Sequence, residues 1–274
     1  MIGATGAATP ENRGNIINSG FIVGSAGVIV IDPGPHRAHA LRLLAAIRKI
    51  TALPVKLVID THPHPENVLG NAVFAQQGAA ILAHSETLKA MRERCEHCRE
   101  NLTKALGADI MAGTEIALPT LGVEQSSKAV FAGRELRLLH YGWGHSEGDL
   151  AVLDKKSGVL FSGGLVSLNR IPVLQLAKTR GWIHALRKLR GEKFKILVPG
   201  NGPVSSPQRV NHTLDYLQSL LALVEKQYQA GMSVLDLLKQ SDLPKYKKWA
   251  LYDEQHPLNV QHVYGELEKE ELEK

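Results

Sequence analysis

The sequence has few aromatic residues, few cysteines and no long apolar run. Aromatic side chains make up 5% of the 274 residues, so the chain offers no evident stacking platform for nucleic-acid bases. No apolar run approaches the roughly 20 residues that cross a bilayer. We therefore predict a small-molecule substrate or ligand, no nucleic-acid partner and no membrane span. The oligomeric state is left open.

The two cysteines are Cys95 and Cys98, in a segment predicted to be helical over residues 85–106. Residues three apart share a helix face, so the two thiols can meet. With His84 and His97 nearby, a small metal site is one interpretation. A redox pair is another, and it requires a lowered thiol pKa. Partly buried small residues or a local disulfide is the third.

Composition indicates an ordinary globular protein. Hydrophobic residues make up 44% and charged residues 22%, enough for a sizeable core. The net charge of +5 arises from scattered basic residues and indicates a mild preference for anionic ligands. We predict one domain over residues 1–274, with a first half at 1–125 and a second at 126–209. A mostly helical extension follows at 210–274.

Hydrophobic patterns predict strands that alternate with helices, which is typical of an α/β layered fold. Strands are expected at residues 21–23, 28–32, 55–59, 80–83, 129–131, 136–139, 150–153, 159–162 and 195–198. Helices are expected at residues 37–50, 67–77, 85–106, 181–189 and over most of the chain from 210 onward.

Three histidines have the pattern of a metal site. His62 and His64 follow the apolar run at 55–59, and alternate side chains at a strand end point to the same side. His145 follows a second strand-like run, at 136–140. Three imidazoles with an open fourth position are the arrangement of a catalytic zinc.

Several segments, in this order, resemble the metallo-β-lactamase-fold hydrolases. They are residues 31–34, 64–71, 145–150, 169–172, 198–203 and 249–261. The nearest subgroup is the one called sulfur-oxidation or quinoprotein-relay zinc metallohydrolases. The resemblance implies an αββα sandwich, here with a C-terminal helical extension, and loops from both halves that meet at the metal.

The sequence departs from the family pattern at four ligand positions. Glu66 stands where the family has Asp, and Asn67 and Asn201 each stand where it has His. Gly164 replaces the Asp that bridges two metals. Glycine has no ligand atom, and an amide is a weak zinc ligand. We therefore expect one zinc at most, at His62, His64 and His145, and no dinuclear centre.

The resemblance and these residues together predict a zinc hydrolase with a weakened site. A metal-bound hydroxide would cleave an ester, thioester, lactone or amide, with Glu66 as general base. Asn67 or Asn201 would donate to the developing oxyanion. The alternative is a catalytically inactive family member, with zinc absent or structural, that acts as a binding or accessory protein. A redox or metal-handling protein centred on Cys95 and Cys98 is a third hypothesis.

Four further residues are expected near the histidines. Asp32 and Asp149 would orient imidazoles or hold the loops by accepting backbone hydrogen bonds, although simple turn capping explains them equally well. His36 and His140 are placed at the pocket mouth. The resemblance implies a periplasmic location if an export signal is missing from this chain, and a cytoplasmic one otherwise.

Overall fold

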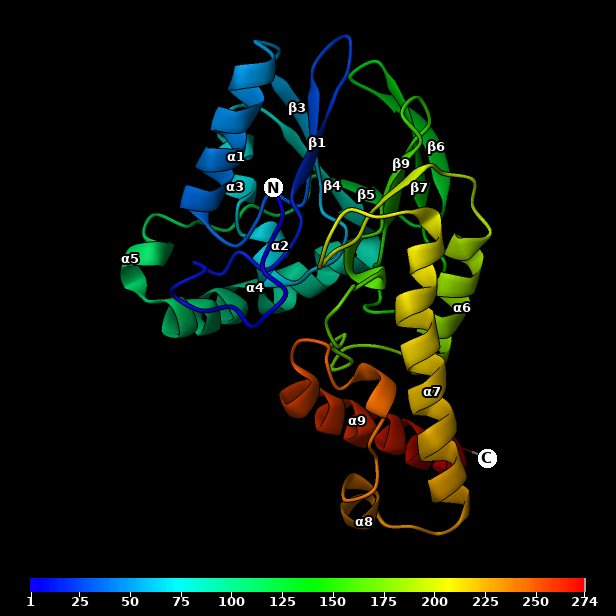
Figure 1. Ribbon diagram of the computed structural model, residues 1–274. Coiled ribbons are helices and arrows are strands. Elements are labelled where there is room, and N and C mark those ends of the chain that lie inside the picture. The colour runs from blue at the N-terminus through cyan, green and yellow to red at the C-terminus, as the bar shows by residue number, and fades with distance from the viewer. Residues whose placement is uncertain (274) are drawn as a thin grey trace.

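The computed structural model describes residues 1–273 and contains two five-stranded sheets that pack face to face, with helices outside them (Figure 1). The sheet orders are β1-β2-β3-β4-β5 and β10-β9-β8-β7-β6. The strands of the first sheet are β1 Gly20–Val23, β2 Val28–Ile31, β3 Val55–Ile59, β4 Ala80–His84 and β5 Leu121–Val123. The strands of the second sheet are β6 Ser127–Phe131, β7 Arg134–Leu139, β8 Ala151–Asp154, β9 Val159–Phe161 and β10 Ile196–Val198. The α/β fold expected from the sequence is confirmed.

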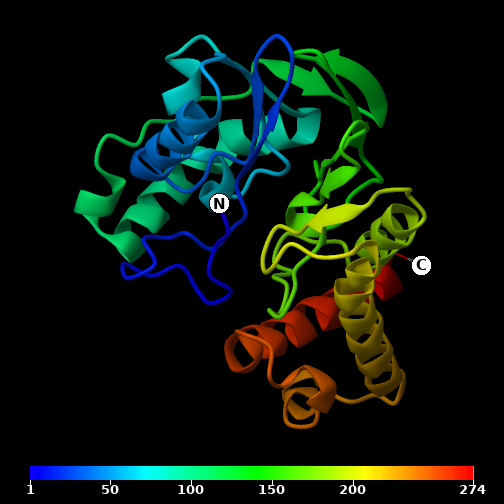
Figure 2. The same cartoon turned by 45° about the horizontal axis from the view of Figure 1, so that its top comes forward.

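Helices cover the outer faces of both sheets and form the C-terminal part of the molecule (Figures 1 and 2). The first group is α1 Arg37–Ile50, α2 Pro65–Val68, α3 Asn71–Ala75, α4 Ser85–Leu106 and α5 Ala108–Met111. The second group is α6 Thr179–Arg190, α7 Val210–Gln229, α8 Val234–Leu238 and α9 Tyr252–Leu272. Short 3₁₀ turns lie at Gly163–Leu165, Pro207–Arg209 and Pro244–Tyr246.

Strand β2 shows why the chain forms layers. All four of its residues are buried, because it has helices on one face and the second sheet on the other. Ile29 and Ile31 belong to the core between the sheets, together with Leu138 of β7. Val28 and Val30 belong to the core beneath α1. Continuous apolar runs such as this one therefore define the centre of the sandwich.

The candidate site lies where strands of both sheets end. In the first sheet β2 and β3 run parallel, so Asp32 and the loop that begins at Asp60 emerge at the same edge. The long loop between β7 and β8 carries His145. The ends of the strands thus bring segments distant in sequence to one place, a common position for ligand sites in α/β proteins.

The helix predicted at residues 67–77 is wrong, because the chain forms two short helices, α2 and α3, on either side of Gly70. The Gly70 amide donates to the Gly34 carbonyl at 2.8 Å. A Cβ atom on Gly70 would lie 2.6 Å from the Pro33 carbonyl oxygen. The close approach of the two backbones requires glycine here and interrupts the helix. Strand β5, with only three residues, was not predicted.

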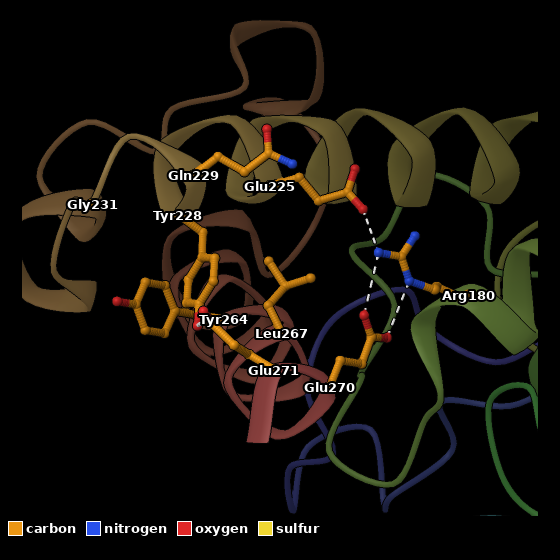
Figure 3. Close-up of a pocket in the computed structure, with 9 residues that line it drawn as sticks. All are labelled: Arg180, Glu225, Tyr228, Gln229, Gly231, Tyr264, Leu267, Glu270 and Glu271. Carbon is orange, nitrogen blue, oxygen red and sulfur yellow. Dashed lines mark hydrogen bonds and ion pairs between the residues drawn. The ribbon is translucent and has the colours of Figure 1, made fainter. Parts of the chain in front are cut away.

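The C-terminal helices pack against α6. Figure 3 shows Arg180 of α6 between Glu225 of α7 and Glu270 of α9, with nitrogen–oxygen distances of 2.5 and 3.1 Å. These side chains line an open groove of about 600 Å³ that also contains Tyr228 and Tyr264. None of the three candidate histidines lines it. Within residues 1–273, no helix is both long and apolar enough to span a membrane.

Candidate metal centre

The three predicted histidines converge. His62 and His64 lie in the loop after β3, and His145 comes from the loop between β7 and β8. One ring nitrogen from each lies within 4.8 Å of the others. His64 Nδ1 and His145 Nε2 are 3.2 Å apart. Among residues 1–273 this is the one group of three or more His, Cys, Asp or Glu side chains close enough to hold an ion.

A short hydrogen-bond chain orients His62. The Thr61 hydroxyl donates to Asp32 Oδ2 at 2.8 Å and lies 2.9 Å from His62 Nδ1. Since its single hydrogen goes to Asp32, the hydroxyl accepts from His62 Nδ1–H. This tautomer leaves the Nε2 lone pair of His62 free to face the other imidazoles.

Burial controls the charge of these groups. It lowers the pKa of His62, His64 and His145, so the imidazoles are neutral and each presents a lone pair at neutral pH. Burial also raises the pKa of Asp32 to about 7, although hydrogen bonds from Thr61 oppose that shift. Three neutral nitrogen donors with an open side are a donor set that suits zinc.

Asp149 holds the loop that carries His145. Its carboxylate accepts from the Ser146 backbone at 3.0 and 3.1 Å and from the Ser146 hydroxyl at 2.7 Å. Burial raises the pKa of Asp149 to about 7. Its contact is therefore with the backbone next to His145, which fixes the position of the imidazole through the loop.

Gly164 leaves no room for a bridging side chain. A Cβ atom at this position would lie 2.1 Å from Cδ2 of His145. The His145 ring occupies the space into which a side chain at 164 would extend. The position therefore lacks both the ligand atom and the volume of a bridging carboxylate.

Asn67 and Glu66 lie beside the histidines in the first turn of α2. Asn67 is 1% exposed, and its amide lies near enough to Asp32 to oppose the rise in the pKa of that carboxyl, but neither Oδ1 nor Nδ2 makes a hydrogen bond of good geometry among the described residues. Glu66 is only partly exposed, with Oε1 3.9 Å from Nδ1 of His64. A buried amide whose hydrogen bonds are incomplete is costly, so Asn67 can pair with a bound group.

Asn201 differs from Asn67 because its amide is already engaged. Oδ1 accepts from the Ser167 hydroxyl at 2.9 Å, and Nδ2 donates to the Ile16 carbonyl at 2.7 Å. These bonds join the loop after β10 to two other segments. Nδ2 carries a second hydrogen, so an oxyanion could use this donor only in the direction that these two bonds leave for it.

A cavity of about 420 Å³ surrounds the three histidines. Glu66, Asn67, Gly164 and Asn201 line it, as do Arg94, His97, Cys98 and Asn101 of α4 and Ser167, Arg170 and Gln175 of the second half. The sequence reasoning did not single out Thr61 or Arg170. Two features of the sequence could have indicated them. Thr61 carries a hydroxyl next to a ligand histidine, and Arg170 lies within the segment 169–172 that resembles the family.

Two further histidines do not have the predicted position. His36 is fully buried at the start of α1, where Nε2 contacts the Arg13 carbonyl and Nδ1 accepts from the His39 amide. His140 stacks on His84 with ring centroids 3.9 Å apart. Neither lines the cavity, because these histidines cap α1 and join the ends of the two sheets.

The cysteines are free thiols on α4. Cys95 is buried in an apolar cluster with Leu69 and Met91, and burial raises its pKa to about 12. Cys98 is half-buried, and burial raises its pKa as well. A redox pair needs the opposite shift. Neither thiol joins a metal-binding group among the described residues.

Comparison with known proteins agrees with this geometry. Residues 12–201 match the Metallo-beta-lactamase superfamily. The chain belongs to this superfamily. Among curated relatives, a linear primary-alkylsulfatase from Pseudomonas sp. is 24% identical over 259 residues. That match covers 80% of this chain but only 49% of the relative, so the chain spans about half the relative's length.

Other superfamily members match over more of their own length. Metallo-beta-lactamase IND-1 from Chryseobacterium indologenes is 23% identical over 205 residues, which are 73% of this chain and 77% of the relative. The structure of a metallo-beta-lactamase from Pontibacter korlensis matches 72% of this chain and 85% of its own, with a TM-score of 0.61 and 22% identity. The structure of IND-7 gives 0.60 and 24%, with 74% and 86% covered. The expected superfamily and fold are confirmed, and the alkylsulfatase relative is in keeping with a sulfur-related subgroup.

Proposed function

We propose that the chain is a hydrolase with at most one zinc ion, held by His62, His64 and His145. The observation that carries this proposal is the convergence of three neutral imidazoles, two buried and that of His64 partly buried, at an open cavity. Zinc at such a site supplies a Lewis acid that lowers the pKa of water towards ~7. The substrates would be esters, thioesters, lactones or amides, and the alkylsulfatase relative adds sulfate esters to the screen.

The chain's own residues would share the remaining work. Asp32 and Thr61 fix the tautomer of His62. Glu66, beside His64, would accept a proton from the attacking water. The Asn67 amide, buried and without a partner, would donate to the oxyanion. Asn201 is the weaker candidate for that donation, since its amide already joins two loops.

The alternative is an inactive superfamily member that binds a ligand in the same cavity. The observation that favours it is the loss of the bridging position, where Gly164 adjoins the His145 ring. Substrates that need a second metal to stabilise the leaving group would then not be cleaved.

Metal content is the deciding measurement. We expect mass spectrometry of the untagged protein, grown with zinc, to find about one zinc per chain. The His62→Ala variant should lose the zinc together with any esterase activity. His184→Ala, which changes an exposed histidine on α6, should retain both.

Two other results would overturn parts of the proposal. Two metals per chain would contradict the mononuclear assignment. A protein without metal that hydrolyses no ester, thioester or sulfate ester would favour the ligand-binding alternative.

A further inference from the structure

Arg170 is a buried cation in the wall of the candidate metal centre. It is 7% exposed and lines the cavity that contains the three histidines. Its backbone is fixed on both sides, since the Ala250 amide donates to the Asn169 carbonyl and the Ile171 amide donates to the Ala250 carbonyl. The guanidinium is therefore held in a defined position rather than on a free surface loop.

Only one nitrogen of the guanidinium has protein partners. Nη1 donates to the carbonyls of Thr5 at 3.3 Å and Gly6 at 2.6 Å. Among the described residues Nε and Nη2 make no hydrogen bond, and the guanidinium makes no ion pair with a carboxylate. The two nitrogens without partners form one edge of the planar fork.

A buried arginine without a counterion is unfavourable in the free protein. Burial lowers the pKa of Arg170, and the charge of Glu66 opposes this shift only in part. Buried charges are normally paired, because removing an ion from water costs several kcal/mol. The missing counter-charge is therefore expected from a bound molecule.

The cavity around Arg170 has the character of an anion site. Arg94 of α4 also lines it and makes no ion pair among the described residues. Asn67, whose amide has no partner, lies in the same wall. The imidazoles between them are neutral and add no repulsion to an anion. Two cations and one carboxylate, Glu66, thus surround one cavity of about 420 Å³, which leaves an excess of positive charge in a volume suited to a small molecule.

We propose that Arg170 binds an oxyanion of the ligand, a carboxylate, sulfate or phosphate, through Nε and Nη2. Two parallel N–H···O bonds from one guanidinium edge fit the spacing of two oxygens in any of these groups. Arg94 adds long-range attraction at the more exposed side of the cavity. In combination with the proposed hydrolase function, the substrate is a small ester or related compound with an anionic group near the scissile bond.

Anion binding is measured first, on the full chain without added metal, so that it does not depend on hydrolysis. Sodium sulfate, sodium phosphate and sodium succinate are titrated separately at constant ionic strength by calorimetry. We expect saturable binding to the wild type of at least one of them, and a loss of about tenfold or more in Arg170→Gln. Arg170→Lys keeps the charge but not the fork and should recover only part of the affinity. Arg187→Gln, on the exposed face of α6, is the matched control and should bind as the wild type does.

Nuclear magnetic resonance of the wild type tests the same assignment without relying on a variant that could fail to fold. Addition of the bound anion should shift the Nε–Hε resonance of Arg170 and leave that of Arg187 in place. Absence of saturable binding, or equal affinity in Arg170→Gln and the wild type, would overturn the assignment. An Arg170 resonance that does not shift when the anion is at saturation would also overturn the assignment.

Hydrolysis tests the substrate class separately. With zinc added, kcat/KM is compared for neutral 4-nitrophenyl acetate and anionic mono-4-nitrophenyl succinate. The ratio of anionic to neutral kcat/KM should fall by about tenfold or more in Arg170→Gln. An unchanged ratio would contradict the role of Arg170 in substrate choice. Failure of the wild type to cleave either ester would count against the proposed hydrolase and leave the calorimetric result as the test of anion binding.

Discussion

At the scale of single residues, the Thr61 hydroxyl connects Asp32 to His62. Thr61→Val removes it while nearly preserving the shape of the side chain. We expect zinc affinity to fall by about 10- to 100-fold, because the tautomer of His62 is no longer fixed. Competition with a chromogenic chelator measures this. Thr103→Val, which removes a hydroxyl that bonds only within α4, should leave the affinity unchanged. Equal affinities for both variants would show that the hydrogen-bond chain does not orient the ligand.

Also at this scale, Gly164 provides the space that His145 occupies. Gly164→Asp restores the acidic residue of the family pattern, yet its Cβ atom would lie 2.1 Å from the imidazole. We therefore expect less than one zinc per chain rather than two, measured by mass spectrometry. Gly265→Asp is the matched control, since a Cβ atom there meets nothing within 4 Å. Two zinc ions in Gly164→Asp would show that the histidine loop moves aside to accept a second metal.

At the scale of one element, α1 carries a buried histidine that does not accept a proton in the folded state. Burial, aided by the charge of Arg42, lowers the pKa of His39 to about 3. Its Nε2 lies 3.0 Å from the Ser19 hydroxyl. The unfolded chain takes up a proton near pH 6.5, so the unfolded state binds more protons as the pH falls. Stability due to His39 is present above about pH 6.5 and is lost on acidification, by about 2 kcal/mol at pH 5.

Urea unfolding at about pH 7.5 and about pH 5 tests this effect. His39→Gln should lose about 2 kcal/mol less than the wild type on acidification, because glutamine does not titrate. His184→Gln, with its exposed side chain, should behave as the wild type does. Identical losses in wild type and His39→Gln would mean that His39 takes up a proton in the folded state.

At the scale of the whole molecule, the C-terminal extension supports the candidate site. Asn259 of α9 is 1% exposed and donates to the Pro172 carbonyl at 2.8 Å. Its Oδ1 accepts from the Leu174 amide at 3.3 Å. These bonds fix the segment that follows Arg170. The extension thus acts on the site through the loop it holds.

Asn259→Leu removes these two bonds together with those to Tyr216 and Gln255, and should lower the free energy of unfolding by about 1–3 kcal/mol. We also expect weaker binding of the anion, because the loop that holds Arg170 loosens. Urea unfolding and calorimetry measure the two effects. Gln261→Leu, on the exposed side of the same helix, should change neither. If Asn259→Leu is less stable but binds the anion with wild-type affinity, the C-terminal extension does not influence the anion site.

Local patterns determined most elements of the fold. The apolar runs of β2 and β3 and the helix over residues 85–106 follow from periodicity, which depends only on neighbours in the chain. The break at Gly70 does not, because it arises from a backbone 36 residues away, at Gly34. A strand of three residues, such as β5, is too short to show a recognisable alternation of apolar and polar residues. The proposed division into a half at 1–125, a half at 126–209 and an extension stays a prediction.

The sequence by itself determined the chemistry of the candidate centre. It contains three histidines in metal-binding motifs and departs from the family pattern at the positions of a second metal, and both features depend only on which atoms each residue carries. Tertiary structure decided which groups are free to act. It engages both amide atoms of Asn201 but leaves those of Asn67 without partners, and it buries Arg170 without a counterion. Hydrogen bonding and burial depend on segments far apart in the chain, which is why the sequence alone could not assign them.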